Sequence, residues 1–154
     1  EKPEDAGLQL LSCLFATVQI SVCLDQITDD MKRMLLFWLG FMDEKREILL
    51  HSQIQPEEPE NLYPEVCAEC GNEKILVHYS EGRLAELRDI NKKIYYIHAV
   101  KEEEVCFRCN SSDTLKYEVR DCYGNLMESN EVSANQFVII SVPTSGMVEF
   151  TRKL

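Results

Sequence analysis

The sequence predicts an α+β fold, in which an N-terminal helical hairpin precedes a zinc-stabilised antiparallel β domain. Apolar residues recur at helical spacing in residues 1–52, whereas apolar and polar residues alternate along several segments of residues 65–154. Two Cys-x-x-Cys pairs lie within that second part. Between the two units, residues 53–64 are rich in proline and acidic side chains and are interpreted as a connector.

The composition is that of a globular protein with a strongly acidic balance. The chain has 154 residues, and its hydrophobic content of 45% is sufficient for a core. The net charge of -11 weighs against broad electrostatic attraction to phosphate backbones or to anionic membranes.

The longest uncharged run covers residues 6–24 and approaches the length of a membrane span. It contains several polar side chains, which insertion into a bilayer penalises: Gln9, Ser12, Thr17, Gln19 and Ser21. We therefore interpret the run as a buried helix, and we expect an intracellular protein, nuclear or cytoplasmic, without a membrane partner.

Two helices are predicted in residues 1–52. Pro3 and Thr28 are typical helix-start residues, and Thr28 is followed by two aspartates that suit a first helical turn. The helical repeats that support the two helices are Leu8, Leu11, Phe15, Val18 and Val22 in the first, and Met31, Leu35, Trp38, Met42 and Leu49 in the second.

The second helix contains the run MLLFWLGFM, residues 34–42, which is apolar on every side. Such a helix is either central to a core or covered by a partner. Packing within the chain is the simpler interpretation, and a protein interface or self-association through this helix is the alternative. Gly40 destabilises a helix interior and is interpreted as a point of close backbone approach. The candidate partner-binding residues are Leu36, Phe37, Trp38 and Phe41.

The connector and the strands follow in order. Pro56, Pro59 and Pro64 exclude a helix or the interior of a sheet from residues 53–64. Residues 73–80, 93–100, 114–121 and 146–154 read as strands, and residues 82–91 as a short helix between the first two of them. The segment QFVIISVP, residues 136–143, is apolar on both faces and is interpreted as a central strand.

The two Cys-x-x-Cys pairs predict one structural zinc ion per chain. The four ligands would be Cys67, Cys70, Cys106 and Cys109. A Cys-x-x-Cys turn presents two thiolates on one side, and two such pairs complete a tetrahedron. Gly71 and Asn110 directly follow the two pairs, and both residue types tolerate the positive φ that such turns require.

Other uses of the cysteines remain open. Disulfides would need an oxidising compartment, and seven cysteines cannot all pair. Cys13 and Cys23 lie among apolar residues and are interpreted as core, and Cys122 as an uninvolved turn residue. His78 and His98 lie in predicted strands and are alternative metal ligands.

Catalysis is not expected. Four thiolates close the coordination shell of zinc, whereas a catalytic zinc keeps an open position for water. The sequence also contains no phosphate-binding Walker loop, no dinucleotide-binding glycine motif and no nucleophile elbow. We therefore predict that the protein is not an enzyme.

The segment CFRCNSSDTLKYEVRDCYGN resembles the zinc ribbon inside the OB-fold at the C-terminus of the large subunit of replication protein A. Those domains bind single-stranded DNA and assemble with partner subunits. The resemblance covers residues 64–142, although the two pairs are further apart here and helices precede the first. The same thiol layout is similar to β-tent zinc domains of the Yippee type, which bind proteins. The resemblance therefore implies an OB-like or a β-tent fold.

Two functions follow from these observations. The first is a non-catalytic, zinc-stabilised protein-interaction module that forms one subunit of a larger complex. The alternative is an OB-like domain of a DNA replication or repair complex that binds single-stranded nucleic acid. The acidic charge favours the first. The residues that would contact nucleic acid in the alternative are Lys92, Lys93, Tyr95, Arg108, Lys116 and Arg120.

Overall fold

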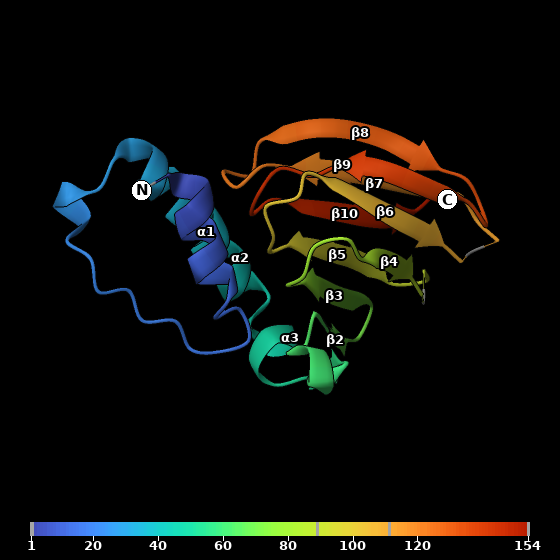
Figure 1. The fold of residues 1–154 in the computed structure, drawn as a ribbon, viewed down its shortest axis with the longest axis horizontal. Helices are drawn as coiled ribbons and strands as arrows, with labels where there is room; N and C mark the ends of the chain where they lie inside the picture. Colours follow the sequence, from blue (N-terminus) through green and yellow to red (C-terminus); the bar gives the residue numbers. More distant parts are fainter. Residues whose placement is uncertain (1, 89, 111, 154) are drawn as a thin grey trace.

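The computed structural model describes residues 2–88, 90–110 and 112–153. It confirms the α+β class: helices pack on one face of a seven-stranded sheet, and a three-stranded sheet packs on the other (Figure 1). The described strands thus form two stacked sheets. No helix in these ranges is long and apolar enough to cross a membrane.

The first helix is shorter than predicted. Helix α1 covers Pro3–Leu11, where the prediction continued it to Val22. The Ser12 backbone N–H closes the last turn on Leu8 O at 3.0 Å. The following run TVQISV is rich in β-branched residues, which lose side-chain freedom in a helix. Residues 12–28 are therefore irregular, apart from a 3-10 turn at Leu24–Gln26.

The second helix begins as predicted and ends earlier. Helix α2 covers Asp29–Glu44, and Thr28 Oγ1 accepts a hydrogen bond from the Met31 backbone N–H at 3.2 Å. Lys45 leaves the helical conformation, with φ -100°, and a separate helix α3 covers Arg46–Leu50. The buried Lys45 ammonium forms an ion pair with Glu73 at 2.7 Å, which ties this break to the sheet.

The strands alternate between two sheets. The seven-stranded sheet has the order β1-β2-β3-β5-β10-β7-β8, and the three-stranded sheet has the order β4-β6-β9. The strands are β1 Gln53–Glu57, β2 Glu65–Cys70, β3 Glu73–His78, β4 Leu84–Leu87, β5 Lys93–His98, β6 Glu104–Cys109, β7 Leu115–Arg120, β8 Leu126–Val132, β9 Phe137–Ser141 and β10 Met147–Arg152. The prediction of purely antiparallel pairing was wrong, because β3 pairs with β5, and β4 with β6, in parallel.

Three sequence-based assignments differ from the structure. The helix predicted at residues 82–91 is wrong, because β4 occupies Leu84–Leu87; residue 89 lies outside the described ranges. Ala85 and Leu87 alternate inward, which is a strand pattern. Part of the connector forms β1, where Pro56 is tolerated because β1 is an edge strand. Residues 59–61 form a 3-10 turn, Pro59–Asn61.

The strand β9 is at an edge of its sheet, whereas the sequence predicted a central strand at residues 136–143. Its apolar character on both faces suggested that both faces are covered. In the structure Ile140 is buried, but Phe137 and Ile139 are 63% and 67% exposed. Burial of one face only makes β9 a half-buried edge strand with an uncovered apolar face.

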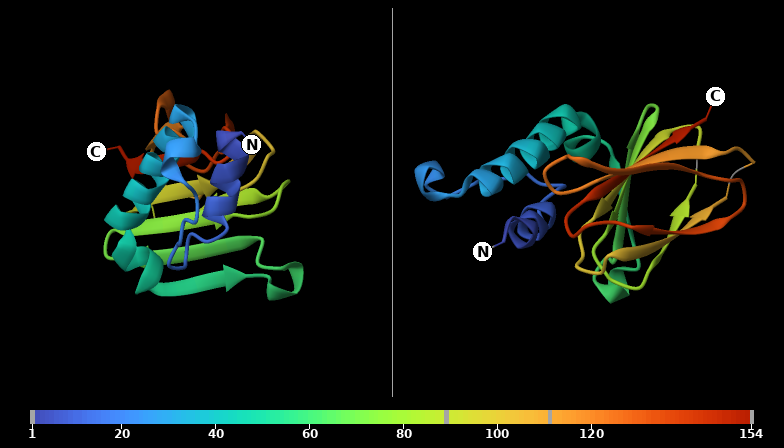
Figure 2. Two further views of the ribbon diagram at one scale, coloured as in Figure 1. Left: turned by 90° about the vertical axis from the view of Figure 1, so that its left-hand side faces the viewer. Right: turned by 90° about the horizontal axis from the view of Figure 1, so that it is seen from above.

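The two faces of the seven-stranded sheet bury separate cores. Because side chains alternate along a strand, Ile94 and Tyr96 of β5 point into the core between the sheets, and Tyr95 and Ile97 point toward the helices. From α2, Met34, Trp38 and Phe41 pack onto this second face. Residues 1–52 are therefore attached to the β part through a shared core (Figure 2).

One turn anchors both long helices. Ser145 lies between β9 and β10, and its carbonyl oxygen accepts a hydrogen bond from Trp38 Nε1 at 3.2 Å. Its hydroxyl donates to the carbonyl oxygen of Glu4 in α1 at 2.9 Å. Gly7 permits this contact, because a Cβ atom at that position would lie 2.5 Å from Ser145 Oγ.

Replacing Trp38 with Ala should lower the free energy of unfolding by about 3 to 5 kcal/mol, because the side chain is fully buried and the change leaves a large cavity. Chemical denaturation followed by circular dichroism measures this loss. Leu36→Ala in the same helix is the matched control. Leu36 is 73% exposed, so the expected change is within about 0.5 kcal/mol. Equal effects of the two substitutions would contradict the packing described.

Candidate functional site

The helix α2 carries apolar residues on more than the face that packs on the sheet. Met34, Trp38 and Phe41 follow the spacing i, i+4, i+7 and lie on the sheet. Leu36, on another side of the helix, is 73% exposed. The apolar run therefore both fills the core and continues onto the surface.

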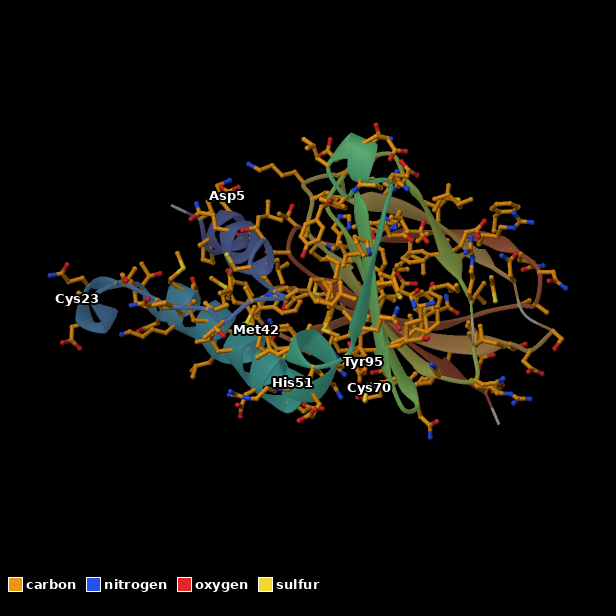
Figure 3. All side chains as sticks on the ribbon, turned by 90° about the horizontal axis from the view of Figure 1, so that it is seen from below. Asp5, Cys23, Met42, His51, Cys70 and Tyr95 are labelled. Atoms are coloured by element: carbon orange, nitrogen blue, oxygen red, sulfur yellow. The ribbon has the colours of Figure 1, made fainter. Side chains whose placement is uncertain are left out.

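An apolar groove of about 410 Å³ lies beside this exposed side. Part of the irregular segment at residues 12–28 runs along α2 and forms the other wall. Figure 3 shows this segment, with Cys23 labelled, extending away from the two sheets. The residues that line the groove are Ile20, Val22, Ile27, Lys32, Leu35, Leu36 and Leu39.

Gly40 does not mark a close approach within the chain, and its interpretation as a point of approach for another backbone stays a prediction. A Cβ atom at Gly40 would have no atom within 4 Å from outside its own helix. Glycine in a helix interior lowers stability by about 1 kcal/mol relative to alanine, and no local contact compensates for it here. Gly40 is exposed and follows Leu36 by four residues, so it lies on the same side of α2.

The four predicted partner-binding residues have different environments. Trp38 and Phe41 are buried in the chain's own core, and Phe37 is partly buried, with its ring centroid 5.0 Å from that of Trp38. Only Leu36 is exposed. Sequence reasoning missed the groove residues Ile20 and Val22, because it placed them within a helix that the structure ends at Leu11.

The predicted zinc ligands lie on two strands that belong to different sheets. Cys67 and Cys70 are in β2, and Cys106 and Cys109 are in β6. Residues three apart on a strand point to opposite faces. Cys67 and Cys109 accordingly lie in the core between the sheets, whereas Cys70 is exposed and Cys106 is only partly buried.

This arrangement does not fit one four-thiolate site. Within the described ranges, no group of three or more His, Cys, Asp or Glu side chains is placed to hold a metal ion. Burial raises the pKa of the Cys67 thiol. Gly71 does have the predicted positive φ, at 56°, and forms the turn between β2 and β3. The zinc site stays a prediction.

The other three cysteines differ in exposure. Cys13 and Cys23 are exposed, so their assignment to the core was wrong, and the early end of α1 is the reason. Cys122 is buried against the helices, and burial raises the pKa of its thiol to about 11. At neutral pH the Cys122 thiol is therefore protonated and is a poor nucleophile.

The two histidines that were alternative metal ligands belong to a buried hydrogen-bond network. His78 Nε2 lies 2.6 Å from Glu65 Oε2, and the Tyr96 hydroxyl lies 3.3 Å from His78 Nδ1 and 3.2 Å from His98 Nδ1. His98 Nε2 donates to the carbonyl oxygen of Glu102, since a carbonyl can only accept. Burial lowers the pKa of His98. Both rings are thus engaged within the core.

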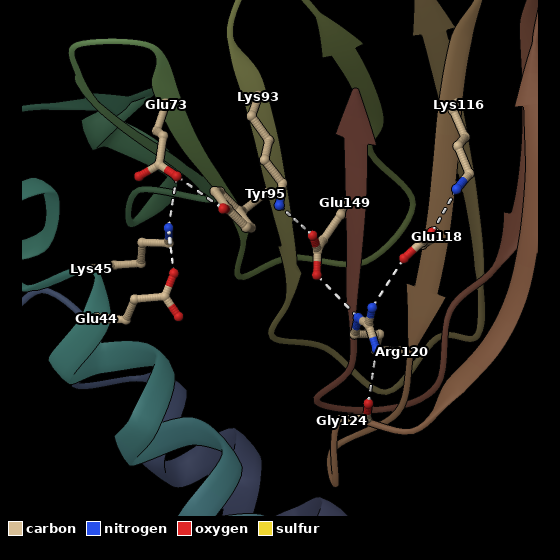
Figure 4. A network of polar contacts seen from close by, with 10 residues as sticks. All are labelled: Glu44, Lys45, Glu73, Lys93, Tyr95, Lys116, Glu118, Arg120, Gly124 and Glu149. Atoms are coloured by element: carbon tan, nitrogen blue, oxygen red, sulfur yellow. Dashed lines mark hydrogen bonds and ion pairs between the residues drawn. The ribbon is translucent and has the colours of Figure 1, made fainter. Parts of the chain in front are cut away.

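The cations that the sequence assigned to nucleic acid lie next to carboxylates. Lys93 Nζ and Arg120 Nε both contact Glu149, at 2.6 and 3.0 Å (Figure 4). Lys116 contacts Glu118 at 2.8 Å. The remaining ion pairs are Lys92 with Glu69 at 2.8 Å and Arg108 with Glu86 at 3.6 Å.

The aromatic residue of that set is not accessible for base stacking. Tyr95 is buried on the face that packs against the helices, and its hydroxyl donates to Glu73 at 3.0 Å. The ammonium groups of Lys45 and Lys93 lie over its ring, at 4.6 and 4.7 Å from the centroid. Of the predicted partner-binding residues, Leu36 is the one that is exposed, and it lies beside the groove along α2.

No protein-family model, curated protein or solved structure matches this chain.

Thiol reactivity tests the zinc prediction. In the arrangement described, Cys70 is exposed and should be alkylated at the same rate with and without a strong chelator, whereas Cys67 and Cys109 should react only on unfolding. Mass spectrometry of the modified peptides measures each rate, and Cys70→Ser should remove the fast modification at that position. A zinc content of one ion per chain, with Cys70 protected until chelator is added, would instead establish the predicted site.

Proposed function

We propose that this chain is a non-catalytic protein-interaction module that receives an apolar helix of a partner subunit in the groove beside α2. The observation that carries the proposal is the exposure of Leu36, at 73%, above a groove with six apolar residues and one lysine. An exposed apolar patch of this kind on a soluble surface favours an interaction site.

A helical partner fits the spacing of the residues that line the groove. Leu35, Leu36 and Leu39 line the groove along α2. Gly40 lies one helical turn after Leu36 at its margin, where it lines the neighbouring hollow between α2 and the sheet. Another helix can approach α2 closely at the glycine and insert its own side chains between the leucines. The helix stability lost at Gly40 is then offset by contacts made only in the complex.

The charge of the chain adds a second requirement for the partner helix. The net charge of -11 gives the chain a negative surface as a whole, whereas Asp43 and Glu44 near the end of α2 are paired with Arg46 and Lys45. A partner helix with basic residues flanking its apolar face would gain electrostatic attraction and a faster association rate. The occupant we propose is thus an amphipathic helix with apolar and basic residues.

The absence of catalysis is part of the same proposal. Cys67 and Cys122 are buried with raised pKa values, and the rings of His78 and His98 are engaged in the core. An OB-like or β-tent fold with one structural zinc ion stays a prediction. Such a zinc site would have to join two sheets, since one Cys pair lies in β2 and the other in β6.

Site-specific photo-crosslinking tests the groove. A photoreactive amino acid at position 36 of the full chain should form one adduct in cells, and the same residue at position 126, also exposed but in β8, should not. Substituting Gly40 with Leu should abolish the adduct by blocking helix approach, whereas Gly40→Ala should retain part of it. An adduct that Gly40→Leu leaves unchanged would refute a helix in this groove.

Nucleic-acid binding remains the alternative, and no contact among the described residues favours it. Because the assigned cations lie beside carboxylates, we expect single-stranded DNA to bind with a dissociation constant above about 10⁻⁵ M near physiological salt, the non-specific range. Fluorescence anisotropy with a labelled oligonucleotide measures this constant. Tight, salt-sensitive binding that is lost on Lys116→Ala or Arg120→Ala would make the alternative the better proposal.

A further inference from the structure

A second uncovered apolar surface lies on the outer face of the three-stranded sheet, away from the groove beside α2. Strand register places Leu84, Cys106 and Ile139 in one row across this face. The next row contains Glu86, Arg108 and Phe137, with the Arg108 guanidinium 5.6 Å from the centre of the Phe137 ring. Phe137 and Ile139 are 63% and 67% exposed, so nothing in the described ranges covers them.

The outer edge of this sheet is β9, which pairs only with β6 within the described ranges. At one end of β9 the Cys109 N–H donates to the Gln136 carbonyl oxygen, and at the other end the Val142 N–H donates to the Glu103 carbonyl oxygen. The even-numbered residues along β9 therefore form the backbone hydrogen bonds with β6. In an antiparallel ladder the alternate residues direct their N–H and C=O groups the other way. The backbone groups of Phe137, Ile139 and Ser141 therefore point to the open edge.

Among the four edge strands of the described sheets, β9 alone lacks the features that prevent edge pairing. Proteins protect sheet edges with charged residues or proline. The strand β1 contains Pro56, β4 contains Glu86, and β8 contains Glu128 and Glu131. The sequence of β9 is FVIIS, with neither a charge nor a proline. Its edge is thus open to another strand.

We propose that β9 pairs antiparallel with β9 of a second copy of this chain, about a two-fold axis at Ile139. This register places Ile139 opposite Ile139 of the second copy, and Phe137 opposite Ser141 of the second copy. The large Phe137 ring thereby lies beside a small side chain at both ends of the new strand pair. The two three-stranded sheets become one continuous sheet.

The charges on the outer face are complementary under the same two-fold rotation. Arg108 lies beside Phe137 at one end of the β6 and β9 pair, and Glu104 lies beside Ser141 at the other. The rotation places Arg108 of one copy and Glu104 of the other on one line across the joined sheet, three strand spacings or about 14 Å apart at their Cα atoms. The match of the large Phe137 with the small Ser141 at this one register is what distinguishes a second copy from an unrelated strand.

Sedimentation across a concentration series, near physiological salt, tests the proposal on the full chain. The wild-type chain should reach twice the monomer mass. Ile139→Lys should weaken dimer formation at least about tenfold, because it places two ammonium groups at the two-fold axis. Leu126→Lys, at an exposed residue of β8, is the matched control and should leave the dimer unchanged. Circular dichroism confirms that both variants are folded.

A cysteine crosslink tests the register. Ile139→Cys should form a disulfide-linked dimer under oxidising conditions, because the two-fold axis places the two residues directly opposite each other, at a separation that a disulfide can span. A chain that stays monomeric at every concentration would overturn the proposal. Equal dimer strength in wild type and Ile139→Lys would overturn it as well, and a dimer in which Ile139→Cys does not crosslink would overturn the register at Ile139.

Discussion

The position of Ser145 is the constraint on which the arrangement of helices and sheets depends. Its backbone is left-handed, with φ 52°, and the residue is fully buried. Its carbonyl oxygen holds Trp38 of α2, and its hydroxyl holds the Glu4 carbonyl of α1. One turn between β9 and β10 thus fixes both helices. Because Trp38 is fixed toward the sheet, Leu36 is directed away from it, and the groove residues of α2 are displayed as a consequence.

Local interactions made part of this fold predictable. Thr28 caps α2 as its position before two aspartates indicated, and the alternation of Leu115, Tyr117 and Val119 identified β7. The strand β9 was misplaced because its sequence gives only the apolar character of each face. Whether a strand is central or at an edge depends on pairing with distant segments, here β6, which single-sequence periodicity does not encode.

The candidate site was predictable only in part, for the same reason. An all-apolar helix indicates several buried or covered faces, but it does not assign Trp38 to the core and Leu36 to the surface. The cysteine pairs were interpreted as turns, whereas Cys67 and Cys70 lie within a strand and point to opposite faces. Strand alternation does explain why Lys116, Glu118 and Arg120 share one face, and this ion-pair cluster was accessible from the sequence.

The central place of β10 has a consequence for synthesis of the chain. In the seven-stranded sheet, β10 lies between β5 and β7, although it follows every other strand in sequence. Translation proceeds at about 5 to 20 residues per second, so β5 and β7 emerge several seconds before the strand that joins them. The turn that anchors α1 and α2 emerges at the same late stage. The nascent chain therefore carries unpaired strand edges and uncovered helices together until β10 has been made.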